Sequence, residues 1–148
     1  MGEPTEERMM AEWAASRLPP GAYRFHVRLG LVRGESPGIL MPAEERAFRL
    51  ITLPEADLVV RAPGTTTALV VEFVVWRPQE TLGQLLFYLE LLPTTPGYED
   101  VTDVRGRIVT GVDEPRFREV VLRYGLEYEV FRPAWLDRAL AQRRGTRS

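Results

Sequence analysis

The sequence contains no cysteine and no lysine, and histidine occurs only once, at His26. Without cysteine the chain can form neither a disulfide nor a thiolate zinc site, and one histidine excludes a histidine cluster within a single chain. All nineteen basic residues are arginine, which excludes mechanisms that use lysine as a base, as a Schiff-base former or as a phosphate ligand. We therefore expect none of these chemistries.

Long apolar runs are also missing. No run reaches the roughly 18 residues that a membrane-spanning helix requires, and the polar start lacks the basic and apolar regions of a signal peptide. We therefore expect no membrane association and a cytoplasmic location, or a place in the virion if a bacteriophage encodes the chain. The length of 148 residues predicts one domain, 1–148, with a substantial core.

The sequence also lacks a large excess of either charge, because nineteen basic residues nearly balance twenty-one acids. The net charge of -2 does not indicate a general polyanion binder. The exception is the segment from about residue 132, where a predicted helix and tail carry five arginines against one acid, Asp137. This segment is either a phosphate contact or a solvated chain end.

The longest apolar stretch, 67–76, predicts a strand with apolar residues on both faces, followed by a helix over 79–92. Such a strand belongs in the middle of a sheet that is covered on both sides. Glu72 is therefore out of place, because a buried carboxylate must be paired, hydrated in a cleft or bound to a cation. The helix has a leucine stripe, and Glu80, Gln84 and Tyr88 share a neighbouring line.

The other elements follow from periodicity and from capping residues. We expect a helix over 5–17, an alternating strand over 23–29, a short strand over 54–61, a strand over 107–111, a helix over 113–125, a strand over 126–131 and a last helix from residue 133. Residues 34–38 and 93–103 are predicted loops, and 42–52 could be a helical turn or a strand. His26 is predicted to be a surface residue, and Phe117, Val120, Val121 and Tyr124 to form a buried stripe.

The order of these elements predicts the fold class. Strands and helices that alternate from residue 67 onward require crossover connections, hence a partly parallel sheet with helices on both faces. The turn at Pro63 and Gly64 predicts an antiparallel hairpin before it. We therefore expect an α/β fold with three α/β/α layers around a mixed sheet.

Two carboxylates are expected to meet on that hairpin. Asp57 lies near the start of one strand and Glu72 lies inside its partner, and two converging carboxylates are typical of a Mg²⁺ site. Alternatively, Asp57 caps a turn or pairs with Arg61 or Arg24, and Glu72 pairs with an arginine of the neighbouring strand. Gln84 and Tyr88 can equally be boundary residues that bond to a loop.

The sequence resembles the PD-(D/E)XK nuclease superfamily in its segments Pro54–Asp57, Val71–Val74 and Gly83–Tyr88. The resemblance implies a restriction-endonuclease-like fold, catalytic roles for Asp57, Glu72 and Gln84, and Mg²⁺ held by Asp57 and Glu72. It also implies contacts with DNA or RNA, for which we single out Arg24, Arg28, Arg77 and Tyr88. On the initial helix, the metal-linked acid of the family is best matched by Glu12, with Glu44 or Glu45 as substitutes.

The chain departs from this family at Val74, which occupies the position of the catalytic lysine. Valine supplies neither charge nor a proton, and Arg77, which could swing in from the strand end, is a poor proton donor because it is effectively always charged. We therefore expect a nuclease-fold protein that associates with nucleic acid and whose cleavage activity is doubtful or lost, a pseudoenzyme. The alternative is a non-enzymatic assembly component, for example of a bacteriophage particle, with protein partners or a homo-oligomeric state.

Overall fold

The computed structural model describes residues 4–31, 42–43, 53–76 and 78–145. The strands are β1 (Tyr23–Arg28), β2 (Glu55–Val60), β3 (Thr67–Val74), β4 (Asp103–Thr110) and β5 (Glu127–Val130); the helices are α1 (Pro4–Arg17), α3 (Gln79–Leu91), α4 (Pro115–Arg123) and α5 (Ala134–Gly145), with a 3-10 turn η1 (Leu92–Thr94). The predicted order of elements is confirmed. The predicted loop 34–38 and most of the undecided segment 42–52 lie outside the described residues. Within the described ranges, no helix is both long enough and apolar enough to cross a bilayer.

The five strands form one mixed sheet in the order β1-β2-β3-β4-β5. β1 pairs with β2 and β2 with β3 in antiparallel orientation, which confirms the predicted hairpin. β3 pairs with β4 and β4 with β5 in parallel orientation. The parallel pairs arise because α3 and α4 carry the chain back across the sheet before the next strand begins.

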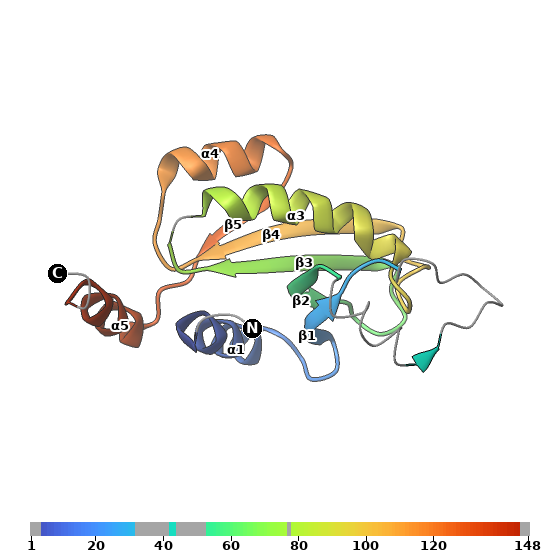
Figure 1. The fold of residues 1–148 in the computed structure, drawn as a ribbon, viewed down its shortest axis with the longest axis horizontal. Coiled ribbons are helices and arrows are strands. Elements are labelled where there is room, and N and C mark those ends of the chain that lie inside the picture. The colour runs from blue at the N-terminus through green and yellow to red at the C-terminus, as the bar shows by residue number, and fades with distance from the viewer. Residues whose placement is uncertain (1–3, 32–41, 44–52, 77, 146–148) are drawn as a thin grey trace.

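Helices cover both faces of the sheet (Figure 1): α3 and α4 lie on one face, and α1 and α5 on the other. Each face has its own apolar core. Leu85, Phe117 and Val121 pack on the α3 face, whereas Met9, Trp13 and Leu136 pack on the α1 face. β3 is the middle strand, and its last five residues are all buried because alternate side chains enter the two cores. The predicted three-layer α/β/α architecture is therefore confirmed.

β1 does not keep the single apolar face that its alternating sequence predicts. Tyr23 packs against the core on the α1 face, whereas Val27 and Leu29 pack against the core on the α3 face. His26 lies between them with a φ of 54° and is the only described non-glycine residue with a positive φ. Such a left-handed residue reverses the side-chain alternation, so the strand changes face at His26.

The predictions for α4 and β4 also need correction. Phe117 and Val121 are buried as expected, but Val120 is 37% exposed and Tyr124 60% exposed, because α4 presents only one line of side chains to the sheet. β4 begins at Asp103, four residues before the predicted position. Its first half contains the exposed, polar Asp103 and Arg105 and the side-chain-free Gly106, so an apolar pattern does not reveal it.

Candidate functional site

The two predicted acids lie side by side on the sheet. Regular pairing between β2 and β3 runs from Val60 and Leu69 to Leu58 and Val71, and the next step of this register places Asp57 opposite Glu72. Residues two apart on a strand share a face, and Glu72 lies between Val70 and Val74, which both belong to the core on the α3 face. On β2 this alternation breaks at Asp57, because Ala56 belongs to the core on the α3 face and Leu58 to the core on the α1 face. Glu72 therefore points to the α3 face, and hydrogen bonds place Asp57 beside it on the adjacent strand.

The backbone of each strand holds the carboxylate of the other. The Phe73 N–H donates a hydrogen bond of 2.9 Å to Oδ2 of Asp57, and the Asp57 N–H donates to Oε1 of Glu72 at 3.4 Å. Neither carboxylate makes an ion pair with a described residue, so the predicted arginine pairings of Asp57 and Glu72 are not found in the described part of the chain. Arg61 instead pairs with Asp100.

Glu72 is an unusual carboxyl group because it is only 5% exposed. Burial, followed by the negative charge of Asp57 and a side-chain hydrogen bond with it, raises the pKa of Glu72 to about 10, although the hydrogen bond from the Asp57 backbone opposes the shift. At neutral pH the Glu72 carboxyl is therefore protonated. Among the described residues, none supplies the pair with the positive charge that would allow both groups to ionise together.

The initial helix brings a third carboxylate toward the pair, but it is not the predicted one. Oε1 of Glu6 accepts a hydrogen bond of 3.4 Å from the Val75 N–H, directly after β3, and the negative charge of Glu6 contributes to the raised pKa of Glu72. Glu12 instead accepts a hydrogen bond of 2.6 Å from Nε1 of Trp135 on α5.

Glu12 lies roughly 9 Å further along the axis of α1 than Glu6. This distance explains why Glu12 cannot be the predicted metal-linked acid. The substitutes Glu44 and Glu45 lie outside the described residues. In the described part of the chain, no three histidine or acidic side chains come close enough together to hold a metal ion. A cation at this place would therefore depend on Asp57 and Glu72.

Tyr88 and Gln84, one turn apart on α3, differ in their relation to the acids. Tyr88 is half-buried, and burial followed by the negative charges of Glu72, Asp57 and Glu55 raises the pKa of its hydroxyl. The Tyr88 hydroxyl thus lies near the acid pair and stays protonated. Gln84 is exposed, and it hydrogen-bonds to no described residue.

Two of the three arginines that were predicted to contact nucleic acid lie on β1 in the described part of the chain. Arg28 pairs with Glu55 at 3.2 Å and donates to the Leu53 carbonyl at 3.1 Å. Arg24 is exposed on β1. Arg77 lies outside the described residues.

Sequence reasoning missed a bridge that connects β1, β2 and α1. Nδ1 of His26 lies 2.7 Å from Glu55, and Nε2 lies 3.1 Å from Glu7. Partial burial would lower the pKa of His26, but the hydrogen bonds to both glutamates and their charges outweigh it, and the pKa is raised. His26 is therefore half-buried and bridged, not the surface residue we predicted. Only its position opposite Asp57 in the β1–β2 register could have drawn attention to it.

Val74 occupies the position where the resemblance expects a lysine. It belongs to the core on the α3 face and is 8% exposed. Its side chain points to the same face as Glu72, two residues before it. A packed aliphatic side chain thus stands where a cation would be required.

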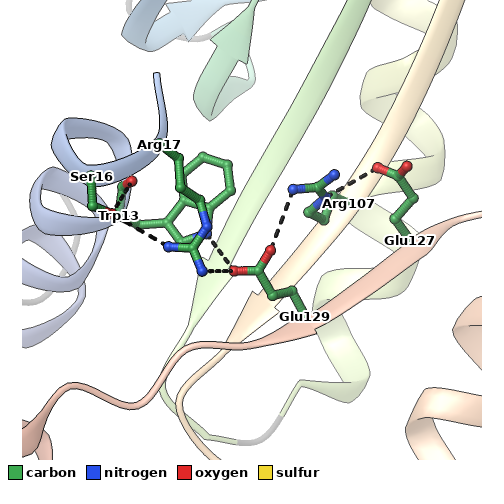
Figure 2. Close-up of polar contacts among 6 residues, drawn as sticks. All are labelled: Trp13, Ser16, Arg17, Arg107, Glu127 and Glu129. Atoms are coloured by element: carbon green, nitrogen blue, oxygen red, sulfur yellow. Dashed lines mark hydrogen bonds and ion pairs between the residues drawn. The ribbon is translucent and has the colours of Figure 1, made fainter. Parts of the chain in front are cut away.

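A polar network that the sequence did not predict connects α1 to β4 and β5 (Figure 2). Glu129 of β5 accepts a hydrogen bond of 2.6 Å from Nε1 of Trp13 and pairs with Arg17 at 2.9 Å, both on α1. Arg107 of β4 reaches Glu127 at 3.1 Å and Glu129 at 3.4 Å. The network fixes the helix whose first turn carries Glu6 and Glu7.

Comparisons with known proteins bear on the fold. No family model matches the sequence, and no curated protein matches it either. Among solved structures, the chain is similar to EndoMS in an EndoMS-dsDNA2 complex, with a TM-score of 0.52 and 17% sequence identity. The match covers 90% of this chain and 47% of the EndoMS chain, so this chain spans about half of that protein's length. The likeness supports the predicted restriction-endonuclease-like α/β fold.

Proposed function

We propose that this chain binds DNA beside the acid pair, where Asp57 is half-buried and Glu72 buried, and that a divalent cation such as Mg²⁺ mediates the contact. The observation that carries the proposal is the close approach of two carboxyl groups from adjacent strands, each bonded to the backbone of the other strand. The EndoMS structure, which contains double-stranded DNA, makes DNA the first nucleic acid to test.

The residues present fit such a cation. Oxygen atoms of carboxylates are the ligands that Mg²⁺ and Mn²⁺ prefer, and Mg²⁺ commonly uses one or two carboxylates while water supplies the remaining ligands. Asp57 and Glu72 would hold the ion, whose positive charge would offset their mutual repulsion and attract a phosphate oxygen. Tyr88, whose hydroxyl stays protonated near the acids, would donate a hydrogen bond to the bound strand.

The proposal assigns binding to the chain and not cleavage. Metal-assisted phosphodiester hydrolysis needs a cation or a proton-transfer group beside the attacking water. Val74 offers neither, and the sequence has no lysine that could replace it. A nuclease assay with Mg²⁺ and with Mn²⁺ is expected to show intact DNA. Cleavage that disappears in Asp57→Asn would show that the chain is an active enzyme.

The binding test compares the affinity for a labelled DNA duplex in Mg²⁺ and in EDTA. Wild-type protein is expected to bind more tightly with Mg²⁺, and Asp57→Asn to lose this gain. Glu119→Gln, which removes an exposed carboxylate of α4, is a matched control that should keep it. Equal gains in Asp57→Asn and wild type would contradict the proposal. Parallel titrations with single-stranded DNA and with RNA identify which nucleic acid is preferred.

A second candidate, an assembly component that acts through protein contacts, is favoured by the surface of α4. Val120, Leu122 and Tyr124 are 37%, 53% and 60% exposed on this helix. If they form a contact with a second copy of the chain, light scattering should show an oligomer that Leu122→Ser converts to a monomer. A monomer at all protein concentrations would remove the homo-oligomeric form of this candidate.

A further inference from the structure

A separate pocket lies beyond the other end of β2. It has a volume of about 280 Å³ and is lined by residues 21–24, Val59, residues 61–64, Gly97 and Tyr98, none of which belongs to the acid pair. Arg61 comes four residues after Asp57, which places the two roughly 13 Å apart along the strand. Because a water molecule occupies about 30 Å³, the pocket can hold a group several times larger than water.

Tyr98 presents an unused donor to this pocket. Its side chain is 8% exposed, and its hydroxyl has no hydrogen-bond partner among the described residues. Every fully buried side-chain oxygen and nitrogen in the described part of the chain has a partner, so the Tyr98 hydroxyl must reach solvent through the pocket. Burial raises the pKa of Tyr98, and the charges of Arg24 and Arg61 only partly oppose this shift. The hydroxyl therefore stays protonated, close to two guanidinium groups.

Arg61 is held in a fixed orientation. It donates to the carbonyls of Thr65 and Gly97, each at 3.0 Å, and its guanidinium carbon lies 6.0 Å from the centre of the Tyr98 ring. These neutral partners orient the guanidinium without cancelling its charge. The one acid that pairs with it in the described structure, Asp100, has a side chain that is 66% exposed. The Arg61 side chain is only 20% exposed, and its hydrogen bond to Asp100 lowers the pKa of that carboxyl. A bound anion would therefore compete with Asp100 for the guanidinium.

Arg24 supplies a second cation. It is exposed at the rim, and in the described part of the chain its guanidinium has neither a hydrogen-bond nor an ion-pair partner. One further acid, Glu99, lies on the neighbouring loop, where its carboxylate accepts a hydrogen bond of 2.9 Å from the Gly97 N–H. Two guanidinium groups and one hydroxyl thus converge on a hollow whose nearest paired acid is exposed to solvent.

We propose that this pocket binds a phosphate group through Arg24, Arg61 and the Tyr98 hydroxyl. A phosphate has several acceptor oxygens and matches the planar donor array of arginine. The phosphate belongs either to the backbone of bound DNA or to a free phosphate ion. The first of these sources rests on the proposed function. Bound there, a DNA strand would contact the protein at a second point, about four residues along the chain from Asp57.

The test is done in EDTA, so that no cation bound at the acid pair contributes. Binding of inorganic phosphate is measured by calorimetry, and binding of a labelled DNA duplex by fluorescence anisotropy at several salt concentrations. Arg24→Gln is expected to weaken binding of both probes roughly tenfold and to lower the salt slope for DNA by about 1. Tyr98→Phe should weaken both less, and Asp100→Asn should strengthen both. Arg123→Gln, an exposed arginine of α4, is the control for net charge.

The outcomes separate this site from the acid pair. Asp57→Asn should keep its metal-free affinity for DNA while Arg24→Gln loses it, which would support the pocket even if the cation site fails. If Arg24→Gln and Tyr98→Phe bind both probes as Arg123→Gln does, the phosphate site is overturned. If wild type binds phosphate through the pocket but binds no DNA, the DNA source is overturned together with the proposed function.

Discussion

At the residue scale, the most unusual feature is a carboxyl group that is kept neutral by its surroundings. Glu72 is buried next to Asp57, and the backbone hydrogen bonds across β2 and β3 keep both groups in place. Two carboxylates cannot both ionise in such a site without a compensating cation. At neutral pH the fold therefore keeps a proton on Glu72, at the position where Asp57 and Glu72 would otherwise hold a metal ion.

This proton makes stability depend on pH. The pKa of Glu72 in the folded protein, about 10, lies above its ordinary value of 4.5, so its contribution to stability is fully present below pH 4.5 and is lost as pH rises toward 10. We predict that the free energy of unfolding falls across this window, by at most about 1.4 kcal/mol per pH unit for one proton. Glu72→Gln should flatten the slope in urea denaturation series at several pH values, and Glu80→Gln should not. Equal slopes in wild type and Glu72→Gln would refute this account.

His26 gives a second, smaller pH effect with the same sign. Its pKa is raised above 6.5, so the bridge to Glu7 and Glu55 stabilises the fold fully below pH 6.5 and weakens as pH rises through the folded pKa. The stability difference between wild type and His26→Gln should therefore be largest in mild acid and shrink in mild alkali. NMR titration of the His26 ring checks the direction independently, and a ring pKa below 6.5 would contradict it.

At the scale of elements, α1 is positioned by both of its ends. Its apolar residues pack against the sheet, its last turns are fastened to β5 through Glu129, and its first turn carries Glu6 to the end of β3. Sequence reasoning predicted the helix and its apolar residues from the N-cap and from periodicity. It could not predict Glu6 as the acid near the site, because the choice between Glu6 and Glu12 depends on how the helix is docked.

Glu129→Gln and Glu127→Gln are a matched pair that tests this docking. Both acids lie on β5 and contact Arg107, but only Glu129 also contacts Trp13 and Arg17 of α1. We predict that Glu129→Gln lowers the free energy of unfolding by about 1–3 kcal/mol and Glu127→Gln by less than about 1 kcal/mol. Urea denaturation measures both values. Equal losses would show that the network does not hold α1.

At the scale of the whole molecule, the layers were predictable and the details of the site were not. The apolar run of β3 and the alternation of strands and helices after it were enough to predict the mixed three-layer sheet. The convergence of Asp57 and Glu72 followed from the hairpin, because its register was limited by the short turn at Pro63 and Gly64. The reversal of β1 at His26 depends on one backbone angle, and no periodic pattern carries that information.

The central claim is that the acid pair binds a divalent cation, and calorimetric titration with Mn²⁺ tests it most directly. Wild type and the control Glu119→Gln are predicted to give the same saturable heat. Asp57→Asn and Glu72→Gln are predicted to give none, since each removes a carboxylate of the pair. Identical heats in all four proteins, or no heat in wild type, would contradict the account.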